Sequence, residues 1–143
     1  MHQMIFVNLP VSDLPRSIRF YESLGFTLEP RFTDDQAACI VISDAIFLML
    51  LTHARFDYFS ALPRSDPAKS SAALLALSRD SRAAVDTITE AALAHGGTEP
   101  KAAIDYGFMY SRTFLDPDGN VFEPMWMDME QAEKAATAVD YPE

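Results

Sequence analysis

One acidic residue is conspicuous because of its position in the sequence. Glu123 lies in the segment NVFEPMW, shortly after the turn sequence DPDG, and most of its neighbours are apolar. A carboxylate placed there could bind a metal ion, hold a ligand or act as a general base, or it could point outward into water. A purely structural role is an equal alternative, in which Glu123 pairs with Arg112 or a tyrosine and fixes the strand register.

Alternation along the predicted strand places Glu123 on a largely apolar face. Successive side chains of a β-strand point to opposite faces, so Glu123 shares its face with Val121, Met125 and Met127. A lone carboxylate there is poorly solvated and requires a cationic or hydrogen-bonding partner. The sequence does not fix the face that Arg112 occupies. Candidate donors come from the first predicted strand and from the segment DYGFMYSRTF, and they are Asn8, Tyr106, Tyr110 and Arg112.

The elements that must position these residues fall into two similar halves. In the first half, residues 3–11 predict a strand by their alternation. Residues 12–25 predict a helix that begins near Ser12 or Asp13 and ends at Gly25. The apolar runs QAACIVIS and AIFLMLLT then predict an antiparallel hairpin.

The second half repeats this order. The segment SAALLALS predicts a strand, and DSRAAVDTITEAALAHGG predicts a helix that begins at Asp80 or Ser81. Two further strands, YGFMYSRTF and NVFEPMWMD, lie on either side of the DPDG turn. The segments GFTLEP and GGTEP, which end at Pro30 and Pro100, occupy equivalent places after the two helices. The pattern indicates a duplicated unit of one strand, one helix and three strands.

Composition restricts the classes of function. A chain of 143 residues with 49% hydrophobic residues suits one packed domain. The net charge of -10 and the scattered basic residues argue against nucleic acid as a partner. No apolar run reaches the roughly 18 residues that a membrane span needs, so we expect no membrane association and a cytoplasmic location. The single cysteine, Cys39, lies in an apolar run and is interpreted as a buried thiol.

The segments NLPVSDLPRSIRFYESLGF and DPDGNVFE, together with the duplication, resemble the vicinal oxygen chelate superfamily. This superfamily contains glyoxalase I, the extradiol dioxygenases and the bleomycin and fosfomycin resistance proteins. The resemblance implies an α+β fold in which tandem βαβββ modules form a cupped mixed sheet, the glyoxalase/bleomycin resistance/dioxygenase fold. It also implies one domain over residues 1–128, with module one at 1–52, a connector at 53–71, module two at 72–128, and a helical tail at 129–143.

Metal-dependent members of this superfamily carry four metal ligands on the inner strands, two in each module. Counting from the helix caps and the turn acids places these positions at Phe6, Met49, Ala73 or Leu74, and Glu123. Only Glu123 is a ligand that a divalent cation prefers, so we expect no metal site and no cofactor. A divalent metal held by a rearranged site, or by a site shared with a partner chain, is the alternative.

We therefore expect a protein that binds a small, largely apolar ligand, a cation being one option, in a cupped pocket. A homodimer is expected, and an interaction module that buries apolar strands in that dimer is a further interpretation. The alternative is an enzyme, namely a metal-dependent lyase or isomerase resembling lactoylglutathione lyase, or a dioxygenase, with Glu123 as a general base if no metal takes part. The predicted pocket residues are Phe6, Asn8, Met49, Tyr110, Arg112 and Glu123.

Overall fold

The structure of the chain is a computed structural model that describes residues 2–135 and 142. The predicted helical tail is described only in part, as α4 (Met129–Ala135). Residues 136–141 and 143 of that prediction lie outside the described residues. Within the described part, no helix has the length and apolarity that crossing a membrane requires.

The first half of the chain forms a four-stranded mixed sheet with one helix. The strand order is β1-β4-β3-β2, in which β1 and β4 are parallel and the other neighbours are antiparallel. A short 3-10 helix, Pro30–Phe32, follows β2. The elements are β1 (Ile5–Val11), α1 (Leu14–Ser23), β2 (Thr27–Glu29), β3 (Ala37–Val41) and β4 (Ile46–Thr52).

The second half forms a second mixed sheet with the same connectivity. The strand order is β5-β9-β7-β6, with β5 and β9 parallel and β8 paired to β9. The predicted strand YGFMYSRTF is divided into β7 and β8, because the facing Pro124 of β9 has no N–H to continue the ladder. The elements are β5 (Leu74–Ser78), α3 (Arg82–Ala94), β6 (Ile104–Asp105), β7 (Met109–Ser111), β8 (Phe114–Leu115) and β9 (Val121–Met127). The predicted α+β fold with two βαβββ modules is confirmed.

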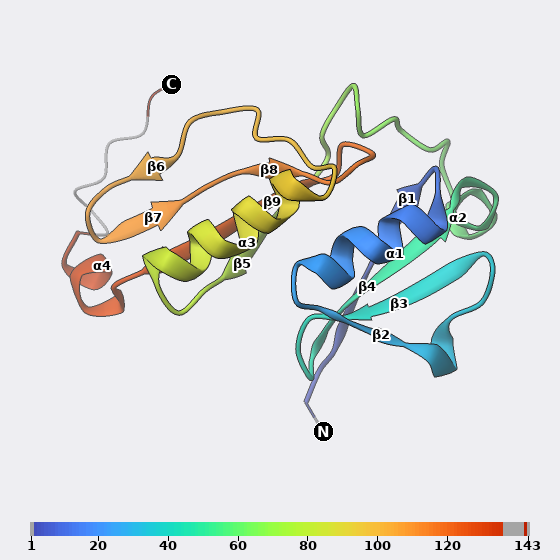
Figure 1. The fold of residues 1–143 in the computed structure, drawn as a ribbon, viewed down its shortest axis with the longest axis horizontal. Helices are drawn as coiled ribbons and strands as arrows, with labels where there is room; N and C mark the ends of the chain where they lie inside the picture. The colour runs from blue at the N-terminus through green and yellow to red at the C-terminus, as the bar shows by residue number, and fades with distance from the viewer. Residues whose placement is uncertain (1, 136–141, 143) are drawn as a thin grey trace.

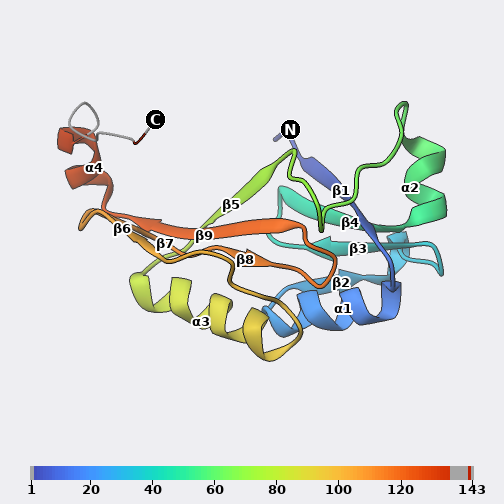
Figure 2. The same cartoon turned by 90° about the horizontal axis from the view of Figure 1, so that it is seen from above.

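The two sheets lie side by side, and their main helices cover the same side (Figure 1). Figure 2 shows α1 and α3 below the sheets, whereas α2 (His53–Phe59) and α4 lie on the opposite side. We call the face of each sheet that points away from α1 and α3 its open face. The loop after α2 crosses from the first module to the second on this side.

Both main helices begin at well-defined caps. The side chain of Asp13 accepts a hydrogen bond from the backbone N–H of Arg16 at 3.0 Å, and Ser81 accepts one from Ala84 at 3.0 Å. These caps decide between the alternatives that the sequence left open. The residue seven positions before Ser81 is Leu74, which is thus the counterpart of Phe6.

The two modules share one hydrophobic core. Phe114 of β8 and Phe122 of β9 stack with their ring centroids 5.4 Å apart, and Tyr21 of α1 packs against Phe122 at 5.7 Å. All three side chains are fully buried, which stabilises the fold by about 1.5–3 kcal/mol for each large apolar side chain. The modules are therefore joined by packing between α1 and the second sheet.

Cys39 is also buried, as the sequence predicted, and its burial raises the pKa of its thiol.

The DPDG turn joins the same two modules through polar contacts. Asp116 is 3% exposed and accepts a hydrogen bond of 2.6 Å from the hydroxyl of Tyr21. Asp118 accepts one from the backbone N–H of Ser12 at 2.9 Å, and Asn120 donates to the carbonyl of Pro10. Burial raises the pKa of Asp116 and of Tyr21, and for Asp116 the hydrogen bonds from Tyr21 and Asn120 partly offset this rise.

Candidate functional site

Three of the predicted pocket residues lie on the open face of the first sheet. The parallel pairing of β1 and β4 sets Phe6 opposite Phe47 and Asn8 opposite Met49. The rings of Phe6 and Phe47 stack with centroids 4.7 Å apart, and Phe6 is 44% exposed. The alternate residues of β1 pack toward α1 and the core. The open face is therefore an apolar surface with the amide of Asn8 within it.

Glu123 lies on the open face of the second sheet, with Val121, Met125 and Met127 as the alternation predicts. Its neighbour on β5 is Ala76, which cannot pair with a carboxylate. Glu123 is partly buried and makes no hydrogen bond or ion pair with any residue that the structure describes. Its carboxylate is thus free to meet a ligand.

The structure does not bring Tyr110 and Arg112 to Glu123. Because Tyr110 pairs with Trp126 and Ser111 with Met125, it is Ser111 that shares the face of Glu123, and Tyr110 and Arg112 point to the helix side. The hydroxyl of Tyr110 donates to Asp86 of α3 at 2.6 Å. The sequence predicted both residues for the pocket, and the pairing register of β7 with β9 places them behind it.

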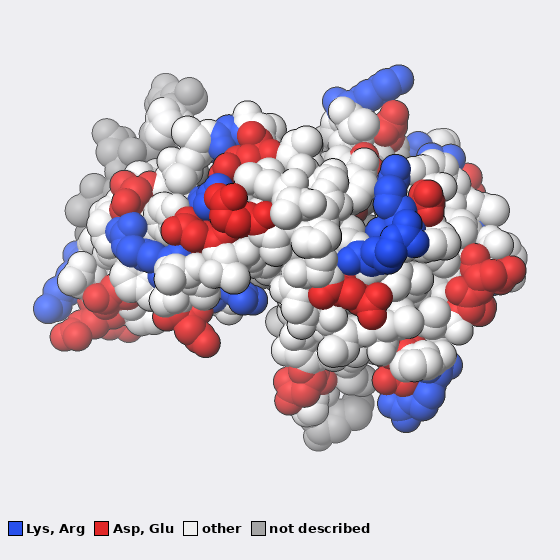
Figure 3. All heavy atoms as spheres, viewed as in Figure 1, with Lys and Arg blue, Asp and Glu red and all other residues white. Residues whose placement is uncertain are grey.

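Arg112 instead holds α3 against the second sheet. Its guanidinium donates to Glu99 at 2.8 Å through two nitrogens, to Glu90 at 2.9 Å and to Asp86 at 3.0 Å. These contacts raise the pKa of Arg112, and hydrogen bonds from Arg112 contribute to lowering the pKa of Glu99 and Asp86. Figure 3 shows acidic and basic side chains intermixed on this helix-covered side. The network is structural and lies away from the open faces.

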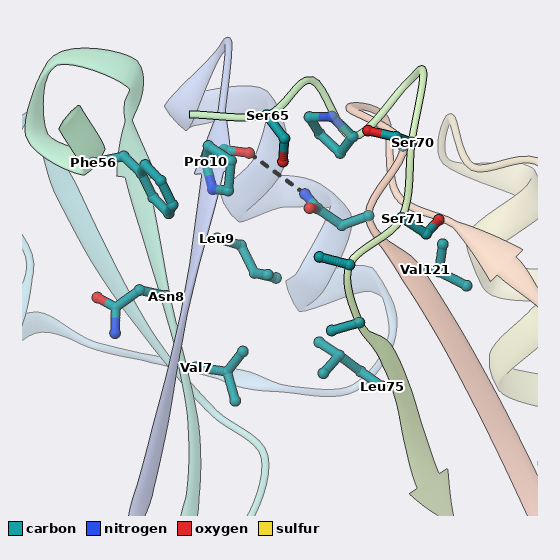
Figure 4. Close-up of a pocket in the computed structure, with 15 residues that line it drawn as sticks. Val7, Asn8, Leu9, Pro10, Phe56, Ser65, Ser70, Ser71, Leu75 and Val121 are labelled. Carbon is teal, nitrogen blue, oxygen red and sulfur yellow. Dashed lines mark hydrogen bonds between the residues drawn. The ribbon is translucent and has the colours of Figure 1, made fainter. Parts of the chain in front are cut away.

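A cavity of about 210 Å³ lies at the junction of the two modules, between β1 and β5 (Figure 4). Its walls come from both strands, from α2 and from the connector that follows. None of its lining residues carries a charge. The apolar lining includes Val7, Leu9, Pro10, Phe56, Leu75 and Val121, and the neutral polar lining includes Asn8, Ser65, Ser70 and Ser71.

A groove of about 470 Å³ adjoins this cavity on the open face of the second sheet. Glu123 and Thr113 line the groove, and so do Lys69 and Lys101. The cavity and the groove are direct neighbours, because Pro67, Ser70, Ser71, Gly119 and Val121 line both. Of the predicted pocket residues, Asn8 therefore lines the cavity and Glu123 lines the groove, whereas Phe6 and Met49 lie on the neighbouring open face and line neither.

The connector supplies pocket residues that the sequence analysis missed. Phe56 belongs to α2, and the serines follow in a polar loop that the sequence indicates only as a linker. The one signal that could have drawn attention to this region is the scarcity of lysine, because Lys69 and Lys101 are two of only three lysines in the chain. That the loop folds back beside β1 follows from tertiary contacts alone.

The donor set on the open faces does not fit a divalent metal ion. The four positions are occupied by Phe6, Met49, Leu74 and Glu123, which together offer one carboxylate and one thioether. Among the described residues, no group of three or more His, Cys, Asp or Glu side chains is arranged to hold a metal. The described part of one chain thus supplies too few ligands for the metal site that the resemblance implies.

The geometry defines a protein of paired βαβββ modules with a cavity at their junction. Residues 3–43 match the family described as bleomycin resistance protein-like N-terminal. Comparison with curated proteins finds no match. Among solved structures, the chain is similar to a hypothetical protein from S. aureus, with 24% identity, a TM-score of 0.73, and coverage of 88% of this chain and 95% of that one.

Two further solved structures show the same architecture. A glyoxalase/bleomycin resistance protein/dioxygenase family enzyme from Burkholderia phytofirmans has 20% identity and a TM-score of 0.70 over 88% of this chain and 99% of that one. A glyoxalase-related enzyme from Fulvimarina pelagi has 20% identity and a TM-score of 0.73 over 88% of each chain. The chain therefore has the fold of the glyoxalase/bleomycin resistance/dioxygenase proteins, its first module matches the bleomycin resistance protein-like family, and the resemblance inferred from the sequence is confirmed.

Proposed function

We propose that the protein binds a small, largely apolar molecule in the cavity between its modules, without a metal ion. The observation that carries this proposal is the lining of the cavity, which is apolar except for a few neutral hydroxyl and amide groups. Such a lining is typical of small-molecule sites, in which apolar walls provide affinity and a few polar groups fix orientation. Each methylene group of a ligand that leaves water contributes about 0.8 kcal/mol.

A screen of small apolar compounds by thermal shift tests the proposal. Ligands should raise the melting temperature of the wild-type protein, and Ser65→Phe, which places a ring in the cavity, should abolish that rise. Ala61→Phe is the matched control, because Ala61 is exposed in the same connector and does not line the cavity. Stabilisation that survives in Ser65→Phe would show that the ligand binds elsewhere.

An enzymatic function is the second candidate, and the free carboxylate of Glu123 favours it. Without a metal, Glu123 would act as a general base toward a ligand in the groove. With a metal, a lyase, isomerase or dioxygenase would need further ligands from a partner subunit. Elemental analysis of protein purified without chelators decides between these cases, since stoichiometric Fe, Zn, Ni or Mn would overturn the metal-free proposal.

We also propose that the protein is a homodimer in which the partner covers part of the open faces. Exposed apolar side chains on the open faces support this proposal, namely Phe6 at 44% and Leu74 at 61%. Large apolar side chains exposed to water favour a protein interface when a partner can cover them. Light scattering should give twice the mass of the 15.9 kDa chain, and Phe6→Lys should shift the mass toward the monomer.

A further inference from the structure

We propose that the ligand carries an anionic group, a carboxylate or a phosphate, which Lys69 and Lys101 bind in the groove beside Glu123. This inference rests on the proposed function, because the apolar part of the same molecule would occupy the adjoining cavity. It departs from the expectation of a cationic ligand, which considered Glu123 alone.

The two lysines reach the groove from separate parts of the chain. Lys69 lies in the connector on an ordered turn, in which the N–H groups of Lys69 and Ser70 donate to the carbonyl of Asp66 at 3.0 and 3.1 Å. Lys101 follows Pro100, and the segment before it is held by the hydrogen bonds between Thr98 and Leu115. Their convergence on one groove is thus a property of the fold.

Both ammonium groups are free of carboxylate partners. Neither Lys69 nor Lys101 forms an ion pair with any residue among those the structure describes, whereas six of the eight arginines do so. In a chain with 21 acidic and 11 basic residues, most cations have an acidic neighbour. The two unpaired lysines in this groove therefore form a local positive site on a protein whose net charge is -10.

The charge balance of the groove favours an anion. Its lining contains two lysines and one carboxylate, Glu123, so the formal charge of its side chains is positive. The hydroxyl groups of Ser70, Ser71 and Thr113 line the same groove and can donate hydrogen bonds to an oxyanion. Glu123 faces the ligand from the floor and can accept a hydrogen bond from a hydroxyl or amine group near the anionic end.

The adjacency of the groove and the cavity indicates the class of ligand. A molecule with an apolar chain fits the uncharged cavity, and its anionic end would reach the lysines past the shared residues Ser70, Ser71 and Val121. The predicted ligand is thus a small amphiphilic anion. Its attraction to the lysines is screened by salt, so its affinity should fall between low ionic strength and 0.5 M NaCl.

Four probes of equal chain length test the charge of the ligand by calorimetry: octanoate, octyl phosphate, octan-1-ol and octylamine. Octanoate or octyl phosphate should bind more tightly than octan-1-ol, and octylamine should bind most weakly. The stronger of the two anions identifies the oxyanion. Tightest binding of octylamine would show that Glu123 dominates and would overturn the inference.

Lysine variants then locate the anionic group. Lys69→Gln and Lys101→Gln should each weaken octanoate binding by roughly threefold, as expected for exposed ion pairs, and should leave octan-1-ol binding unchanged. Lys134→Gln is the matched control, because it removes the same charge from α4, outside the groove. An equal loss in Lys134→Gln, or no loss in either groove variant, would overturn the inference and leave the proposed function standing. Failure of both octanoate and octan-1-ol to bind would instead count against the proposed function.

Discussion

The substitution Tyr21→Phe should destabilise the protein by about 2 kcal/mol. It removes one hydroxyl, which donates a hydrogen bond of 2.6 Å to Asp116 at the junction of the modules. Both side chains are buried, with Tyr21 at 0% and Asp116 at 3% exposure, so water cannot replace the lost donor. Hydrogen bonds to charged groups contribute about 1.5–3 kcal/mol, and Asp116 keeps three other donors, from Asn120 and Asp118, which limits the loss.

The packing of the ring should survive the substitution. Tyr21 packs edge-on against Phe20 at 5.0 Å and against Phe122 at 5.7 Å, and phenylalanine retains both contacts. Guanidinium denaturation should therefore show a lower midpoint with an unchanged slope, and the melting temperature should fall by roughly 6 °C for a domain of this size. Tyr58→Phe is the control, because Tyr58 is 80% exposed and should change stability by less than about 0.5 kcal/mol.

The alkaline range gives a second measurement on the same variant. Burial raises the pKa of Tyr21 well above its usual value, so the unfolded chain loses this proton before the folded chain does. The contribution of the Tyr21 hydroxyl to the free energy of unfolding is therefore complete below about pH 10. Above that pH it decreases by about 1.4 kcal/mol for each pH unit. Tyr21→Phe should remove that share of the decline. A variant within about 0.5 kcal/mol of the wild type at pH 7, or with the same alkaline slope, would refute the role given to this hydrogen bond.

Three further predictions concern other parts of the molecule. Arg112→Met should lower the free energy of unfolding by about 2 kcal/mol, because it leaves three facing carboxylates without their cation. Ligands should still raise the melting temperature of this variant. Loss of ligand binding would show that Arg112 belongs to the pocket. In chemical denaturation, Gly119→Ala should destabilise the protein more than Gly107→Ala. Both glycines have positive φ, but of the two only Gly119 would place a Cβ close to another atom, 2.7 Å from the carbonyl oxygen of Pro67. Equal losses of stability in the two variants would contradict this. The free energy of unfolding should fall between about pH 4 and 2. Arg82 lowers the pKa of Asp105 to about 2, and the stabilisation from this ion pair disappears as Asp105 is protonated. In a plot of stability against pH, Asp105→Asn should show a smaller decrease over this range.

Much of the fold was predictable from the sequence because its signals are local. Alternation predicted β1 and β9, and the residues suited to caps predicted where α1 and α3 begin. The division of one predicted strand into β7 and β8 was missed, although Pro124 in the facing strand gives a reason for it. Local sequence rules predict where a strand lies, but they do not show that a residue in the facing strand, such as Pro124, lacks the N–H that the ladder needs.

The candidate site was less predictable because it depends on register and on long-range contacts. Alternation within β9 placed Glu123 and Met125 on one face correctly. The face of Arg112 depends on how β7 pairs with β9, and shifting that pairing by one residue would reverse it. The contribution of Lys69 and Lys101 depends on where two loops come together, which no periodicity encodes.

The buried turn between the modules has a consequence for how such proteins are recognised. Its two carboxylates are committed to the junction, Asp116 to Tyr21 and Asp118 to Ser12 and Arg16. These contacts lie at the junction of the modules, away from the side chains of the open faces, so a substitution on the open faces leaves them in place. The turn sequence therefore reports how the two modules are joined, whereas the side chains of the open faces and of the connector decide what the protein binds.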